Sequence, residues 1–185
     1  MKIEDGKGSG KEMSVSSTQR GNVSAKTAPR IFYSSREDGL AYAAVFDDIT
    51  AAAGEYVAYL QNTSSTRNMF LSDMTAGGVE NIKWKLFVCT GTAASGESVT
   101  PTELNLSKSI PAEAIAMAGN VAITGLTAGE QIATGRSGAN SGAKREFDNA
   151  LILGPNDAIV LEYDAGTGGL CEATFQFHYE DIGAS

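Results

Sequence analysis

Apolar and polar residues alternate with a period of two through most of the chain after residue 37. The pattern is clearest in Val79–Thr90, where Ile82, Trp84 and Leu86 alternate with two lysines and then with a phenylalanine and a cysteine. The last such run, Leu170–Glu180, alternates a cysteine, an alanine and three aromatic residues with polar ones. Successive side chains of a β-strand point to opposite faces, so both runs predict strands with one buried face.

Shorter runs of the same kind are separated by clusters of Gly, Asn, Asp, Ser and Thr, which favour turns. They predict seven further strands: Leu40–Phe46, Glu55–Gln61, Arg67–Thr75, Ala122–Leu126, Glu130–Thr134, Lys144–Leu153 and Ala158–Tyr163. Residues 113–118 fit either a helical turn or the start of a strand.

The segments between these runs differ greatly in length. Gly154-Pro155-Asn156-Asp157 is a strong turn signal, and a Thr-Ala-Gly turn is expected to join Ala122–Leu126 to Glu130–Thr134 as a hairpin. Gly91–Pro111 is predicted to be a long polar connection, and Gly135–Ala143 a solvated glycine- and serine-rich loop. Many strands, uneven loops and few helical signals predict an all-β fold, an antiparallel β-sandwich of jelly-roll-like type.

The first 37 residues differ from the rest in composition. They carry seven basic and four acidic groups, a net charge of +3, whereas the remaining 148 residues carry seven basic and 18 acidic groups, a net charge of −11. Their larger apolar side chains are too few and too scattered to bury a core. We therefore predict two parts, an extended N-terminal arm over residues 1–37 and a β-sandwich domain over residues 38–185.

The charge distribution limits the classes of partner. A net charge of −8 disfavours general binding of nucleic acid, which needs clustered Lys and Arg. An acidic protein surface suits the arm better. The expected contact residues are its cations: Lys2, Lys7, Lys11, Arg20, Lys26, Arg30 and Arg36. No apolar run reaches the ~20 residues that cross a membrane, and the first residues lack the apolar stretch of a secretion signal, so no membrane contact and synthesis in a cytoplasm are expected.

Residues that could carry chemistry fail the tests of pattern and spacing. Ser137 stands in Gly135–Ala139, which lacks the final glycine of a nucleophile elbow. His178, the single histidine, falls on the polar side of the last strand, which predicts an exposed or interface position rather than a catalytic one. The pairs Asp47-Asp48 and Asp148-Asn149 lack cation-site spacing. We expect no catalytic, cofactor-binding or metal-binding residues, and hence no enzyme.

The cysteines and aromatic residues have ordinary structural explanations. Cys89 and Cys171 are expected to be small buried side chains, with a disulfide between adjacent strands as the alternative. Trp84 is predicted to lie in the core. Tyr56 and Tyr59 fall on opposite faces of their strand, so at least one is available for exposure. A sugar-stacking platform would need several such aromatic residues close together.

Three short segments resemble a group of small structural proteins of tailed-phage virions. The first is the opening Ile3-Glu4-Asp5-Gly6-Lys7-Gly8-Ser9-Gly10, followed by a polar stretch around Val15–Val23. The second is Tyr59-Leu60-Gln61-Asn62-Thr63-Ser64, and the third is Gly154-Pro155-Asn156-Asp157-Ala158-Ile159 before a terminal aromatic strand.

The resemblance implies a jelly-roll body that decorates or cements a phage capsid, often as a homotrimer. The implied partners are the major capsid protein and further copies of the chain, and the implied location is the outer capsid surface of the virion. Alternatives are a structural protein of the tail, baseplate or head fibre, and a carbohydrate-binding β-sandwich.

Overall fold

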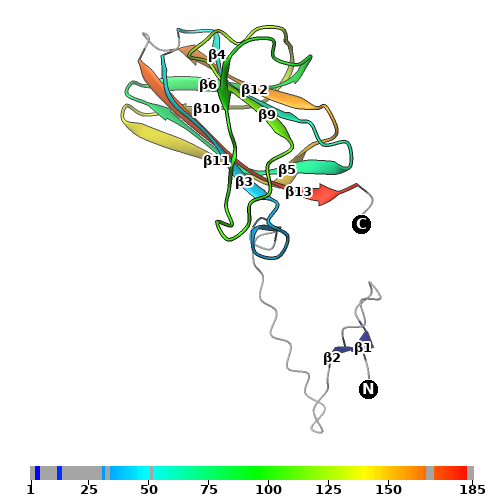
Figure 1. Cartoon of the computed structure of the whole chain (residues 1–185). Coiled ribbons are helices and arrows are strands. Elements are labelled where there is room, and N and C mark those ends of the chain that lie inside the picture. Colours follow the sequence, from blue (N-terminus) through cyan, green and yellow to red (C-terminus); the bar gives the residue numbers. More distant parts are fainter. Residues whose placement is uncertain are drawn as a thin grey trace.

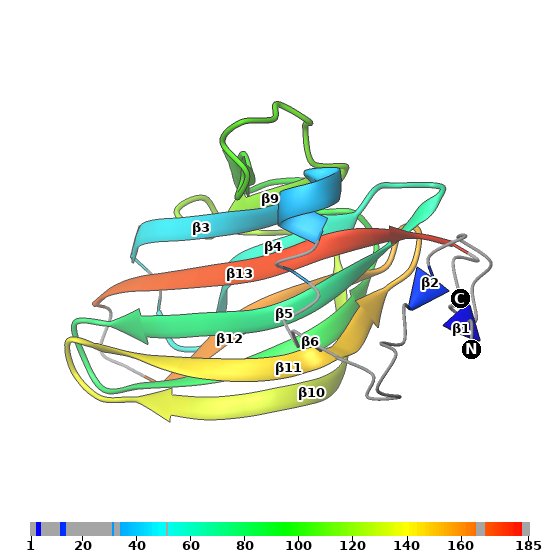
Figure 2. The same cartoon turned by 90° about the horizontal axis from the view of Figure 1, so that it is seen from below.

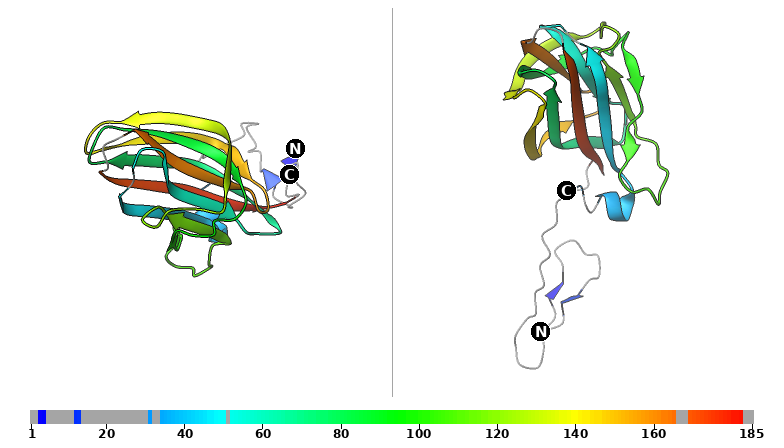
Figure 3. Two further views of the ribbon diagram at one scale, coloured as in Figure 1. Left: turned by 90° about the horizontal axis from the view of Figure 1, so that it is seen from above. Right: turned by 90° about the vertical axis from the view of Figure 1, so that its left-hand side faces the viewer.

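Two antiparallel β-sheets stack face to face around one hydrophobic core (Figure 1). The computed structural model describes residues 3–4, 12–13, 31, 34–50, 52–165 and 169–182. The predicted antiparallel β-sandwich is therefore confirmed, whereas most of the predicted arm lies outside the described residues. The views in Figure 3 show the two layers of strands.

The five-stranded sheet has the order β11-β5-β13-β3-β8, and the six-stranded sheet the order β10-β6-β12-β4-β9-β7. Figure 2 shows β3, β13, β5 and β11 side by side. The bounds of the sandwich strands are β3 Ala41–Thr50, β4 Glu55–Asn62, β5 Arg67–Gly78, β6 Ile82–Thr90, β7 Glu97–Val99, β8 Thr102–Glu103, β9 Ala114–Ala118, β10 Thr127–Ser137, β11 Ser141–Leu153, β12 Ala158–Ala165 and β13 Leu170–Asp181. Before them come the short pair β1 Ile3–Glu4 and β2 Glu12–Met13, and the π-helical turn η1 Ser34–Asp38.

Eight strands pair in a nested way, and this gives the sheet order. β3 pairs with β13, β4 with β12, β5 with β11, and β6 with β10, so the first half of the sandwich runs antiparallel to the second half. This is the strand arrangement of a jelly roll, in which one long hairpin is folded over on itself. The jelly-roll-like connectivity expected from the sequence is therefore present.

Residues 91–126 are an insertion between the innermost pair, β6 and β10. Within it, β8 pairs with β3 at the edge of the five-stranded sheet, while β9 and β7 extend the six-stranded sheet beyond β4. The insertion thus covers the β3 and β4 edges of both sheets (green in Figure 1). The other two edges are β10 and β11, which a tight turn at residues 138–140 joins.

Three sequence predictions change in this region. Residues 122–126 form no strand apart from an isolated bridge between Thr124 and Ser95, so the predicted hairpin with Glu130–Thr134 is wrong. β10 pairs with β6 instead, because the nested arrangement places the two strands together. Residues 114–118 form a strand, β9, rather than a helical turn. Most of the predicted loop Gly135–Ala143 belongs to β10 and β11.

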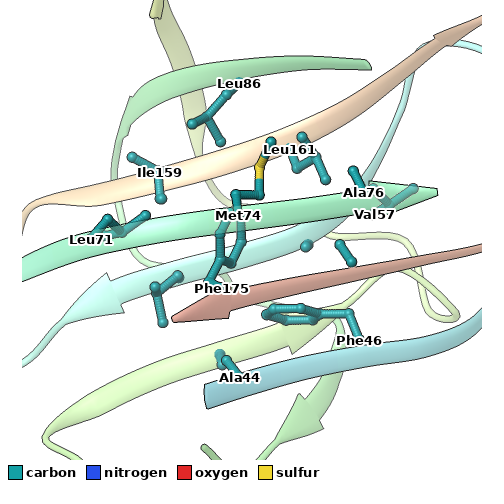
Figure 4. Close-up of a cluster of buried hydrophobic side chains, with 14 of the residues drawn as sticks. Ala44, Phe46, Val57, Leu71, Met74, Ala76, Leu86, Ile159, Leu161 and Phe175 are labelled. Atoms are coloured by element: carbon teal, nitrogen blue, oxygen red, sulfur yellow. The ribbon is translucent and has the colours of Figure 1, made fainter. Parts of the chain in front are cut away.

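The core lies between the two sheets and confirms the faces predicted by alternation (Figure 4). Trp84 is 2% exposed, as expected for a core residue. Phe46 and Phe175 from neighbouring strands meet edge to face with ring centroids 5.6 Å apart, a favourable aromatic geometry.

Candidate interaction surfaces

The arm residues predicted to contact a partner fall almost entirely outside the described part of the chain. Six of the seven cations are not described: Lys2, Lys7, Lys11, Arg20, Lys26 and Arg30. Only the backbone of Arg36 is described, in η1. Their role in binding therefore stays a prediction.

The base of the arm is fixed to the sandwich by backbone contacts. The Leu40 N–H donates to the Ser34 carbonyl at 3.0 Å, which closes the turn around η1, and the Tyr179 N–H donates to the Leu40 carbonyl at 3.0 Å. From the insertion, Asn105 Nδ2 donates to the Ser35 carbonyl at 2.8 Å. The arm therefore leaves the sandwich from a defined place, beside β13 and the insertion.

The insertion presents apolar side chains close to this base. Leu106 is 87% exposed, and Leu104 and Ile110 are also exposed. Asn105 holds the turn that carries Leu106, since its Oδ1 accepts the Ser107 N–H at 3.1 Å and its carbonyl accepts the Lys108 N–H at 2.9 Å. Sequence reasoning did not predict this exposure, because two leucines in a polar segment give too short a periodic signal to show whether they are buried.

His178 is fully buried, so the predicted exposed or interface position is wrong. Alternation does place it on the outer face of the five-stranded sheet. There its ring stacks on Phe70, with centroids 5.4 Å apart, and its Nε2 lies 3.3 Å from Glu180 Oε1. Burial here comes from neighbours that cover the outer face, which the period of a single strand does not reveal.

The remaining candidates for chemistry belong to three different strands, β3, β10 and β11. Ser137 is buried within β10 rather than in a solvated loop, so this prediction too is wrong. Asp47 and Asp48 are exposed and line a hollow of about 320 Å³ with Glu172 and the turns around Gly78 and Asn140. Asp148 and Asn149 form a bulge with positive φ in β11. Among the described residues, no three His, Cys, Asp or Glu side chains are grouped to hold a metal ion.

Both cysteines are buried, as predicted, and neither takes part in a disulfide. Cys171 Sγ donates to the Ile49 carbonyl at 3.0 Å inside the sandwich. Cys89 faces outward from the six-stranded sheet, where residues of the insertion cover it, and burial raises the pKa of its thiol to about 11.

The two tyrosines of β4 do not form an exposed platform. Tyr59 is fully buried, its hydroxyl donates to the Gly91 carbonyl at 3.2 Å, and burial raises its pKa to about 12. Tyr56 is half-buried and lines a second hollow of about 320 Å³ with Glu55 and Asn120. A single half-buried ring gives little support to sugar stacking.

A charged cluster on the outer face of the six-stranded sheet was not anticipated. Lys83 and Lys85 of β6 both bind the Asp164 carboxylate of β12, the second at 2.7 Å, and Lys85 also lies 3.5 Å from Glu162. Hydrogen bonds from the two lysines lower the pKa of Asp164. Because these charges neutralise one another, the cluster is a cross-strand contact within the sheet rather than a free binding site.

Three comparisons, with protein-family models, with curated proteins and with solved structures, find no match to this chain. In the part of the chain that the structure describes, no helix is long and apolar enough to cross a membrane.

Proposed function

We propose that this chain is a non-enzymatic structural protein of a phage virion, a capsid decoration or cement protein. In this proposal the sandwich assembles as a homotrimer on the outer capsid surface, and the basic arm binds an acidic surface of the major capsid protein or of a neighbouring subunit. Attachment at many sites of a lattice gives high avidity from modest single contacts.

The observation that carries the proposal is the resemblance of three sequence segments to virion structural proteins. Two of those segments meet in space. The Asn62 N–H donates to the Asp157 carbonyl at 3.0 Å, and the Asn156 N–H donates to the Asn62 carbonyl at 2.8 Å. The segments are therefore two halves of one corner of the jelly roll. Because the two segments form one structural unit, their resemblance to virion proteins counts as one joint feature rather than as two unrelated matches.

The fold and the charge distribution add support. Jelly rolls are common in viral capsid proteins, although they also occur in lectins and cupins. A net charge of +3 on the arm and −11 on the rest suits binding between copies and between neighbouring capsid subunits.

Antibody labelling of particles from the phage that encodes the chain, combined with its copy number per particle, tests the proposal. We expect labelled heads and hundreds of copies. A handful of copies at one end of the particle would instead assign the protein to the tail, baseplate or a head fibre. Particles without the protein would contradict a virion role altogether.

A further inference from the structure

The two sheets differ in what covers their outer faces. On the six-stranded sheet, Tyr59, Cys89 and Val160 point outward and are buried under residues of the insertion such as Ala93 and Ile123. On the five-stranded sheet, several side chains of the outer face remain open to solvent, although those at the end near η1 are covered. Val45 and Lys144 are each 53% exposed, and Glu146 is 64% exposed.

The strand register defines this open face as four rows that run across β11, β5, β13 and β3. The first row lies nearest the base of the arm and is largely apolar; the next two are polar, and the last has glycines beside a glutamate. In order the rows are Ile152, Phe70, His178 and Ala41; Glu146, Asp73, Gln176 and Ala43; Lys144, Thr75, Thr174 and Val45; and Gly142, Gly77 and Glu172. We call this surface the outer face.

Negative charge is concentrated on the sheet that carries the outer face. The strands of the five-stranded sheet contain nine acidic and three basic residues, a net charge of −6, whereas those of the six-stranded sheet contain five acidic and three basic residues, a net charge of −2. On the outer face itself the carboxylates are Asp73, Glu146 and Glu172, and Lys144 lies 3.4 Å from Asp73 and 3.0 Å from Glu146.

Part of the first row is already covered by other segments of the same chain. Ala41 and His178 point outward from the sheet, yet both are 0% exposed. η1, which leads from the arm into β3, packs against β3 and β13. The incoming chain thus lies at this end of the sheet, next to the polar rows.

The length of the arm exceeds what the outer face of its own chain can bind. The four rows span about 20 Å along β13, at the rise of a β-strand. Lys11 precedes Ser34 by 23 residues, an extended reach of about 75 Å. An arm of this length is long enough for Lys2, Lys7 and Lys11 to reach a neighbouring molecule.

We propose that the outer face is the docking site for the distal arm, residues 1–20, of a second copy of this chain. Lysines of the arm pair with Asp73, Glu146 and Glu172, and the small side chains of Thr75 and Thr174 allow an extended backbone to approach the sheet. This inference rests on the proposed assembly function and identifies the surface that joins the copies.

Zero-length carbodiimide cross-linking of the full-length protein tests the proposal without capsids. Unlabelled and ¹⁵N-labelled protein are mixed, cross-linked and analysed by mass spectrometry, so that a cross-link between copies is recognised by its mixed isotopes. We expect mixed-label links from Lys2, Lys7 or Lys11 to Asp73, Glu146 or Glu172, and a fall in their yield of about threefold at high salt, because salt screens exposed charges.

Matched variants distinguish docking of the arm on the five-stranded sheet from docking on the six-stranded sheet. E146Q/E172Q removes two carboxylates of the outer face, and E97Q/E130Q removes two exposed ones from the six-stranded sheet. The proposal is supported if the total yield of cross-links from the arm lysines falls in E146Q/E172Q but not in E97Q/E130Q. Links of a single isotope only, equal linking to both sheets, or no links at all would overturn it. A capsid role could still hold in each of these cases, because particle labelling tests that role independently.

Discussion

At the scale of single residues, Asn62 has a fully buried side chain whose polar atoms are all hydrogen-bonded to backbone groups. Its Nδ2 donates to the carbonyls of Arg67 and Leu153, each at 2.9 Å. Its Oδ1 accepts the Ser64 N–H at 3.0 Å. The amide thus joins the β4–β5 turn to the end of β11, and an aspartate cannot replace it, because a carboxylate has no N–H to donate.

We expect Asn62→Asp to lower the free energy of unfolding by about 3 kcal/mol or more, since two carbonyls would face an unpaired buried carboxylate. Urea denaturation measures the loss. Asn81→Asp is the matched control, because exposed Asn81 uses only its Oδ1, which accepts the Ala139 N–H at 3.1 Å and which aspartate retains. Equal stability of the two variants would show that the Asn62 donors are dispensable.

Buried Tyr59 and Cys89 predict a loss of stability at alkaline pH. Burial raises their pKa values to about 12 and about 11, from ordinary values of 10.0 and 9.0. Above pH 9 the unfolded chain binds fewer protons than the folded one, so the free energy of unfolding falls as pH rises. We expect a constant urea midpoint up to about pH 8.5 and a decline from about pH 9 to 12. Tyr59→Phe should flatten the decline above pH 10, and a midpoint constant to pH 12 would contradict the prediction.

The sequence correctly predicted burial for residues whose burial is set by the alternation of their own strand. Trp84 and Cys171 are in the core because each lies on the apolar side of an alternating strand. Cys89 is buried as predicted, but on the outer face, where residues of the insertion cover it. The prediction failed for His178 and Ser137. His178 is covered in part by Phe70 of another strand, and Ser137 is buried within β10, which the loop motif around it does not predict.

At the scale of elements, alternation predicted most strands but not their partners. β4, β6, β12 and β13 lie within a few residues of their predicted bounds, and the Gly154–Asp157 turn is present, closed by the Asp157 N–H to the Gly154 carbonyl at 3.1 Å. Short turns suggest pairing between neighbours in sequence, which produced the wrong hairpin at residues 122–134. In a jelly roll the pairs are mostly non-local, so the partner of β10 is set by the whole topology.

The edge strands β10 and β11 carry features that hinder edge-to-edge pairing with the strands of other molecules. β11 has the charged run Lys144-Arg145-Glu146 followed by a bulge at Asp148 and Asn149, and the register of β10 is interrupted near Gln131. Charges and bulges of this kind protect free edges from pairing with other chains.

We therefore expect Lys144→Val/Glu146→Val to increase aggregation through the β11 edge, because it removes two of the four charges of that strand and adds β-branched apolar residues. Light scattering during storage at high concentration measures the change. Thr75→Val/Thr174→Val is the matched control, since it places two valines on the same face but in strands paired on both sides. Equal aggregation of the two variants would assign the effect to the face rather than to the edge.

At the scale of the whole molecule, charge is separated along the chain. This predicts that binding to a partner depends more on the position of a cation than on the net charge of the chain. Replacing Lys2, Lys7 and Lys11 by glutamine changes the net charge from −8 to −11, and so does replacing three cations of the sandwich, Lys108, Arg136 and Arg145. Both variants keep the full chain and the same total charge. They differ in whether the arm or the sandwich loses its cations.

Three exposed ion pairs together contribute about 1.5 kcal/mol. Under the proposed capsid role, we therefore expect the arm variant to bind phage heads lacking the protein about tenfold more weakly at low salt. The sandwich variant should bind within about twofold of the parent, since a uniform change in net charge acts weakly over a screened distance. Cosedimentation with such heads at several salt concentrations measures both, and the arm variant should show the shallower salt dependence. If the two variants weaken equally, binding follows net charge, and the arm has no special part in attachment.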